Sequence, residues 1–116
     1  MSFREILEGL LTAPGARGAA FIDPQGQTVA QAGDPAVTDV LGALQSVWLG
    51  ELGRASRRAG LGAVADLSLD FTNQRVLSAQ VKEGYFLLVV FEAGGLPSMA
   101  RARLEEARDE LAREIG

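Results

Sequence analysis

The side chains in this sequence that could do chemistry are carboxylates, arginines and hydroxyls, because it contains neither histidine nor cysteine. This excludes disulfides, thiol nucleophiles, ordinary zinc sites and His-based triads. The acidic residues Glu105 and Glu106 are neighbours in a predicted helix, so their carboxylates point in different directions and make a poor acid–base pair. The sequence therefore predicts no catalytic residue, no metal site and no cofactor, and we do not expect an enzyme.

Two further features could contact an anion. The segment 92–98, EAGGLPS, is glycine-rich and precedes a predicted helix, but it lacks the lysine and the spacing of a phosphate loop, which favours a plain turn. Arg54, Arg57 and Arg58 form a basic cluster in a chain of net charge −4. The acidic balance argues against nucleic acid as a partner. The three arginines could instead reach a partner protein.

The length of the chain limits its organisation. With 116 residues it can build one core but not two, so residues 1–116 are expected to form a single domain. No apolar run approaches the length of a membrane span, and the opening MSFREILEGLL lacks the features of a signal peptide. We therefore expect a cytoplasmic protein without membrane insertion.

Apolar spacing predicts the order helix, two strands, helix, three strands, helix. Ser2 and Glu5 have the spacing of a capping box at the start of the first helix, which ends at TAPG. Helical spacing returns from Val37 to about Ala59 and again over 100–115. Segments rich in β-forming residues predict strands at 16–23, 27–32, 63–71, 75–82 and 85–92.

The strands at 19–22 and 85–91 are apolar on both faces, which predicts neighbouring positions inside a sheet that has helices on both sides. Because hairpin partners stay adjacent, the predicted order is 2-1-5-4-3, with strands numbered along the chain. The fold class is therefore α/β, with a five-stranded, mostly antiparallel sheet. The strand at 63–71 lies at a free edge, with Asp66, Ser68 and Asp70 on one face and apolar residues on the other.

Three features together resemble a bacterial Roadblock/dynein light-chain domain: this element order, the hairpin GARGAAFIDPQGQTVAQAG, and the segment VLSAQVKEGYFLLVVFEAGG before an Arg/Leu-rich helix. The resemblance covers nearly the whole chain. It implies a profilin-like or longin-like sandwich that dimerises by pairing the third strands and second helices of two subunits. Such domains are commonly non-enzymatic partners, scaffolds or activating factors of small Ras-like GTPases, including polarity GTPases of gliding bacteria. We expect this chain to bind and regulate or localise such a GTPase.

The predicted second helix has an unusual outer face. Its apolar arc, from Val37 through Trp48 to Leu52 and Ala55, is expected to lie on the sheet. The opposite arc is built from small residues, although each interior glycine costs about 1 kcal/mol relative to alanine. Either a partner approaches this face closely, which we favour, or glycine has drifted into a helix held by its buried side. The expected partner-binding residues, with flanking positions, are Gly42, Ala43, Ser46, Leu49, Gly50, Gly53 and Arg57.

The free edge also has two explanations. Asp66 and Asp70 either deter aggregation by their charge, or flank a pairing with a second copy, which we favour. In a pairing they could lie near the basic cluster of the partner's helix. The second copy could also be a paralogue, giving a heterodimer. The expected dimer-interface residues are Ala65, Asp66, Leu67, Ser68, Asp70, Val47 and Arg54.

A different function remains an alternative on the same fold. Profilin-like sheets also serve as ligand-sensing or signalling scaffold modules. That function would need a pocket with convergent polar groups, whereas this sequence supplies mostly aliphatic side chains.

Overall fold

The computed structural model describes residues 1–93 and 98–116, and it describes side chains except at 38, 40, 41, 44–49 and 99. The turn expected at 92–98 therefore falls largely outside the described residues. Over the described residues the chain forms three helices and five strands in the predicted order. They are α1 (Phe3–Leu10), β1 (Ala16–Ile22), β2 (Thr28–Gly33), α2 (Pro35–Arg58), β3 (Asp66–Asp70), β4 (Gln74–Lys82), β5 (Tyr85–Glu92) and α3 (Ser98–Ile115).

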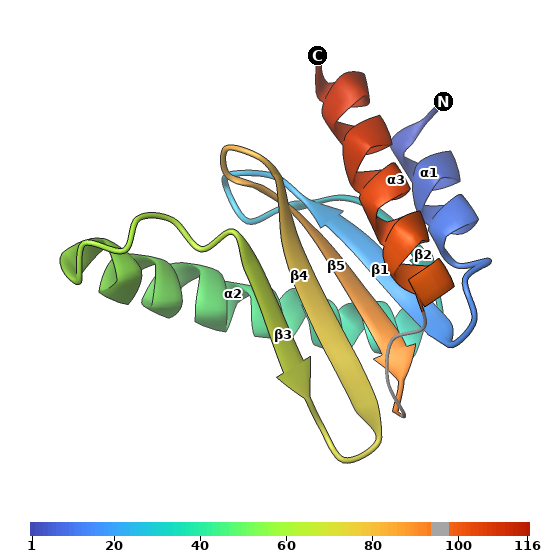
Figure 1. Cartoon of the computed structure of the whole chain (residues 1–116), viewed down its shortest axis with the longest axis horizontal. Coiled ribbons are helices and arrows are strands. Elements are labelled where there is room, and N and C mark those ends of the chain that lie inside the picture. The colour runs from blue at the N-terminus through green and yellow to red at the C-terminus, as the bar shows by residue number, and fades with distance from the viewer. Residues whose placement is uncertain (94–97) are drawn as a thin grey trace.

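The five strands form one antiparallel sheet in the order β2-β1-β5-β4-β3, which confirms the predicted topology. β1 and β5 lie inside the sheet because both of their faces are apolar, and most of their residues are buried. Figure 1 shows α1 and α3 side by side on one face and α2 crossing the other. β3 forms an edge, and in the described part of the chain its pairing is with β4.

Each face of the sheet carries its own apolar core. The larger core fills the space between the sheet and the pair α1 and α3, and it contains Leu7, Phe21 and Leu111, all fully buried. The smaller core lies on the α2 face and contains Val37 and Leu88. The larger core anchors α1 and α3, whereas α2 packs mainly on β1 and β2 within the described residues.

The predicted capping box at Ser2 is confirmed. The Ser2 hydroxyl accepts a hydrogen bond from the Glu5 N–H at 3.1 Å, and the Glu5 carboxylate accepts one from the Ser2 N–H at 3.3 Å. Hydrogen bonding of the Glu5 carboxylate to the Ser2 hydroxyl and to the Ser2 backbone N–H lowers its pKa. At α2, the Asp34 carboxylate accepts from the Ala36 N–H at 3.0 Å, and Pro35 takes the first helical position.

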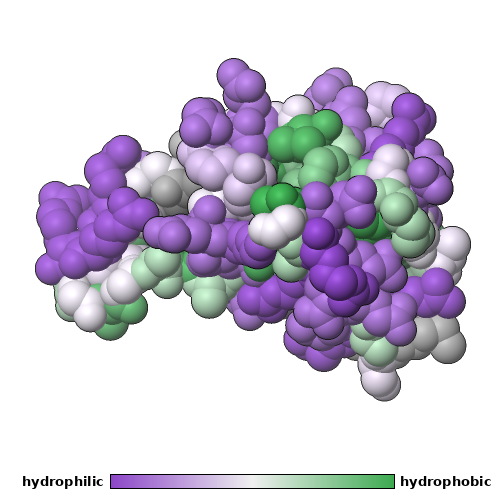
Figure 2. All heavy atoms as spheres, turned by 90° about the horizontal axis from the view of Figure 1, so that it is seen from above, coloured by the Kyte–Doolittle hydropathy of each residue, from purple (hydrophilic) through white to green (hydrophobic). Residues whose placement is uncertain are grey.

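The far end of α2 differs from expectation. Leu52 and Ala55 were expected to lie on the sheet, but both are exposed, Leu52 by 41%. The reason is the length of the helix, whose 24 residues carry its C-terminal part past the edge strand β3 (Figure 1). We call residues 50–58 the α2 end. In Figure 2 the corresponding lobe is mostly hydrophilic, with pale and apolar atoms along one side.

The edge strand is shorter than predicted. β3 begins at Asp66 rather than at residue 63, because the preceding chain turns at Gly60 and Gly62, whose φ angles are +75° and +82°. The carbonyl of Ala65 still accepts a hydrogen bond from the Gln80 N–H at 2.7 Å. No helix among the described residues is long and apolar enough to cross a membrane.

Candidate functional site

The free edge of β3 presents backbone groups at every second residue. Gln80 N–H donates to the Ala65 carbonyl at 2.7 Å, and Phe71 N–H donates to the Gln74 carbonyl at 2.8 Å. The odd-numbered residues of β3 therefore hydrogen-bond to β4. The even-numbered residues direct both their N–H and their C=O groups outward, away from β4. These outward groups belong to Asp66, Ser68 and Asp70.

The two faces of β3 differ in polarity. Leu67 and Leu69 are half-buried and pack against the smaller core on the α2 face. Asp66, Ser68 and Asp70 are exposed on the opposite face, where α3 lies. This alternation is the predicted one. An added strand would therefore extend an apolar surface on one side of the sheet and a charged surface on the other.

Each aspartate of β3 contacts an arginine of its own chain. Arg108 of α3 places its Nη1 3.5 Å from Asp66 Oδ1. Arg75 of β4 lies directly opposite Asp70 and donates to both oxygens of its carboxylate, with 3.2 Å between Nη2 and Oδ2. The hydrogen bond from Arg75 lowers the pKa of Asp70. Both carboxylates of the edge are therefore partly neutralised within the chain.

These contacts argue against the expected pairing of the aspartates with the basic cluster of a partner helix. The aspartates face α3, whereas α2 and its arginines belong to the other face of the sheet (Figure 1). A second copy that continues the sheet would keep its α2 on that other face. Within its own chain, Arg54 pairs with Glu51 of the same helix at 2.7 Å.

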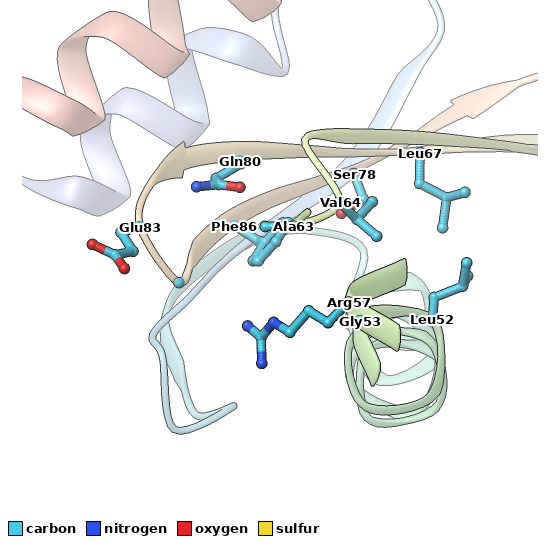
Figure 3. Close-up of a pocket in the computed structure, with 11 residues that line it drawn as sticks. Leu52, Gly53, Arg57, Ala63, Val64, Leu67, Ser78, Gln80, Glu83 and Phe86 are labelled. Atoms are coloured by element: carbon cyan, nitrogen blue, oxygen red, sulfur yellow. The ribbon is translucent and has the colours of Figure 1, made fainter. Parts of the chain in front are cut away.

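A hollow of about 170 Å³ lies between the α2 end and the sheet. Figure 3 shows Gly53 and Arg57 on the side of α2 that faces this hollow, opposite Ser78 of β4 and Phe86 of β5. Gly53 was expected on the arc of the helix that faces away from the sheet, whereas it lines this hollow. The strands of a sheet twist relative to one another, whereas the helix is straight. A different arc of the helix therefore faces the sheet at each end of the helix. The partner-binding roles of Gly53 and Arg57 stay predictions.

The small residues of α2 leave open space. A Cβ atom added at Gly42 or Gly53 would meet nothing within 4 Å, and one added at Gly50 would lie 3.5 Å from the Arg54 guanidinium. Ala43 is exposed. The predicted roles of these residues in binding a partner therefore stay predictions that the geometry allows.

Three expected site residues fall outside the described side chains. Ser46, Val47 and Leu49 belong to α2, but only the helix itself is described at these positions. Their roles in partner binding and dimerisation stay predictions.

Sequence reasoning missed Arg75 and Arg108. Arg75 could have been found, because the tight hairpin between β3 and β4 places it directly across from Asp70. Arg108 has no comparable local signal, since its approach to Asp66 depends on how α3 packs on the sheet.

Comparisons with known proteins agree with this fold. Residues 3–91 match the family model of the Roadblock/LC7 domain. MglB of Myxococcus xanthus superposes with a TM-score of 0.84 at 19% identity, covering 97% of this chain and 94% of that chain. The gliding protein MglB of Thermus thermophilus gives a TM-score of 0.79 at 22% identity, covering 96% of this chain and 86% of that chain. An MglB with a tetrameric arrangement gives 0.79 at 22% identity, covering 96% and 85%. No curated protein sequence gives a significant match.

Proposed function

The chain belongs to the Roadblock/LC7 domain family, and we propose that it works as a homodimer that binds a small Ras-like GTPase and regulates or localises it. Family membership and the likeness to MglB support a protein-interaction module. To this interaction module our proposal adds the homodimer, the GTPase as partner and the non-catalytic role. Of the observed features, the one that carries the proposal is the exposed α2 end beside the free edge of β3 (Figure 1).

Two copies would associate through this region. A free strand edge with unpaired backbone groups is a template for another strand, and monomers normally shield it. Beside it, Leu52 lines a hollow together with Leu67 of β3 and is exposed by 41%, so apolar surface lies next to the edge. A second copy that pairs with β3 would bring its own α2 beside this surface. The tetrameric arrangement of one MglB supports self-association as a property of this fold.

The GTPase would bind on the α2 side of such a dimer. Glycine and alanine at 42, 43 and 50 let the backbone of a partner approach closely, because they carry little or no side chain there. The binding energy would hold the switch loops of the GTPase in one conformation, which changes its nucleotide cycle without a catalytic group from this chain.

The experiment is a binding measurement between this protein and a purified small Ras-like GTPase from the same cell, loaded with GDP or with a non-hydrolysable GTP analogue. The variant Gly50→Glu adds a charged side chain to α2, where glycine has no helix-stabilising role. Gly9→Glu is the control, because Gly9 is also a helical glycine but lies on α1, where an added Cβ meets nothing within 4 Å. Thermal melting of each variant checks the fold.

We expect the GTPase to bind the wild type in one nucleotide state more tightly than in the other. Gly50→Glu should abolish binding, since its side chain fills the space that the backbone of a partner needs, while melting stays unchanged or rises because the carboxylate lies near the Arg54 guanidinium. Gly9→Glu should bind like the wild type. Undiminished binding by Gly50→Glu would refute the α2 surface, and failure of the wild type to bind in either nucleotide state would refute the GTPase as partner.

The ligand-sensing alternative would have its best place at the other end of α2. A groove of about 440 Å³ lies there, with Val37, Phe71 and Val90 among its apolar walls. The charges that it contains, Arg17 and Asp34, pair with each other at 3.5 Å. Few polar groups are thus left to orient a small molecule, which favours the interaction module.

A further inference from the structure

We propose that the pocket between α3 and the strands β3 and β4 binds an acidic peptide segment of a second partner protein, whose carboxylate contacts Arg101 and Arg108. The pocket has a volume of about 260 Å³ and lies on the face of the sheet opposite to α2. The proposal depends neither on the GTPase nor on the dimer proposed above. It assigns a partner to the face of the sheet opposite the one proposed for the GTPase.

The helix α3 places two arginines along one side of this pocket. Arg101, Leu104 and Arg108 follow one another at spacings of three and four residues, so they form one stripe along the helix. Within the described residues α3 packs on β4, the neighbour of the edge strand β3. The stripe therefore lies over β4, with Leu104 buried and an arginine about one turn before and after it.

Neither guanidinium is saturated by contacts within the described part of the chain. Arg108 places its Nη1 3.5 Å from Asp66 Oδ1 and 3.8 Å from Glu105 Oε1, whereas an arginine that hydrogen-bonds to a carboxylate lies at about 2.7–2.9 Å. The Arg108 side chain is only 27% exposed, yet it makes no hydrogen bond to another described residue. Arg101 has neither an ion pair nor a side-chain hydrogen bond among these residues. Both guanidiniums thus keep N–H donors for an oxygen acceptor of a ligand.

The floor of the pocket is apolar. It is lined by the buried residues Leu77 and Ala79 of β4 and Leu104 of α3. A free inorganic anion would be desolvated on such a surface without covering it, whereas a peptide can bring an apolar side chain beside its carboxylate. In an extended peptide the side chains of alternate residues point the same way. An acidic residue two positions from an apolar residue would therefore present both groups to the pocket.

The charges around the pocket favour a single carboxylate over a multiply charged anion. Three arginines and two acidic residues line it, which leaves an excess of one positive charge in a chain of net charge −4. The acidic residues, Asp66 and Glu105, repel any anion, and the repulsion is larger for a phosphate dianion or a nucleic acid than for one carboxylate. The planar guanidinium also matches the two oxygens of a carboxylate.

The first test uses a display library of random peptides, selected on the full chain. We expect enriched peptides in which an acidic residue lies two positions from an apolar one. Each is synthesised together with a counterpart that carries the side-chain amide in place of the carboxylate, and both are measured by fluorescence anisotropy. The amide counterpart should bind at least about tenfold more weakly, because a charge-assisted hydrogen bond is lost. If no peptide with this pattern is enriched, or if the amide counterpart binds equally well, the proposal is wrong.

Variants of the arginines locate the binding site. Arg108→Gln should raise the dissociation constant of the peptide about tenfold, and the more exposed Arg101→Gln about threefold. Arg113→Gln makes the same charge change on α3 but lies in a different hollow beside α1, so it should leave the dissociation constant unchanged. Thermal melting checks the fold, and Arg101→Gln tests the site even if Arg108→Gln destabilises α3. Equal weakening by Arg113→Gln and Arg101→Gln would show an effect of net charge alone and would overturn the assignment.

Competition separates the peptide from other anions and from the other proposed partner. Phosphate and single-stranded nucleic acid should displace the peptide no better than chloride at equal ionic strength. More effective displacement by either of them would mean a general anion site and would overturn the choice of a peptide. Gly50→Glu, which disrupts the surface proposed for the GTPase on α2, should leave peptide binding unchanged. Loss of peptide binding in Gly50→Glu would refute the placement of the site beside α3, whatever the result with the GTPase.

Discussion

Ser68→Pro separates the stability of the fold from that of the dimer. Proline has no N–H and is tolerated on an edge strand only where the missing donor faces outward. The Ser68 N–H is outward, whereas the N–H of Leu69 is directed to β4. Ser68→Pro should therefore leave the monomer folded, and Leu69→Pro should disrupt it by breaking the internal ladder.

The size of the effect on the dimer follows from the bonds that are lost. Each copy loses one donor, so two carbonyl acceptors of the paired strands become buried without a partner. Leaving a buried acceptor unsatisfied costs about 1–3 kcal/mol. The two together weaken the dimer by about 2–6 kcal/mol, which is a roughly 30-fold or greater increase in dissociation constant.

The assay is sedimentation over a range of protein concentrations, combined with urea unfolding at a concentration where the wild type is monomeric. Ser68→Pro should shift the dimer equilibrium and leave the unfolding midpoint of the monomer nearly unchanged. If Ser68→Pro instead unfolds the monomer as strongly as Leu69→Pro, the assignment of outward groups on β3 is wrong. If the dimer keeps its affinity, it does not use this edge.

Three other outcomes are expected. Gly33→Ala should lower the free energy of unfolding by several kcal/mol, because φ is +97° and the new Cβ would lie 2.5 Å from the Arg17 carbonyl oxygen. In the control Gly60→Ala the new Cβ meets open space, so the loss, measured by thermal melting, should be about 1 kcal/mol. Because Arg75 lowers the pKa of Asp70 below its usual 3.8, the pair contributes stability above pH 3.8 that is lost as pH falls through the lower folded value; Asp70→Asn should flatten that acid limb in urea titrations. Calorimetry should detect no GTP binding by the protein alone, since it lacks a phosphate loop and the described residues contain no acidic cluster that could hold a metal ion; saturable binding would contradict the non-catalytic proposal.

Much of the fold was predictable because its signals are local. The capping box at Ser2 and the doubly apolar strands β1 and β5 depend on residues close in sequence, and they led to the observed sheet order. The predicted strand began at residue 63, ahead of the observed start of β3 at Asp66. Alternating alanines at 63 and 65 continue the strand pattern, but the turn at Gly62 delays the pairing with β4.

The candidate site was less predictable because it depends on tertiary geometry. Helical spacing alone placed Gly53 away from the sheet, since an ideal wheel ignores the twist of the strands beneath α2. Spacing also assigned Leu52 to the core, although a hollow separates this part of α2 from the sheet and leaves Leu52 exposed by 41%. The contact between Arg108 and Asp66 arises only when α3 has packed.

If two copies associate as proposed, the projecting α2 end links the local dynamics of this helix to the protein concentration. Its residues have few buried apolar contacts in a single chain, and such segments open locally at a lower free energy than the core. Covering by a second copy would suppress this opening by mass action. Amide hydrogens at 51–58 should therefore exchange faster on dilution, while those of β1 and β5 exchange only through global unfolding of the monomer. The last turns of α2 would then be fully protected from hydrogen exchange only in the assembled protein, so their protection would depend on protein concentration.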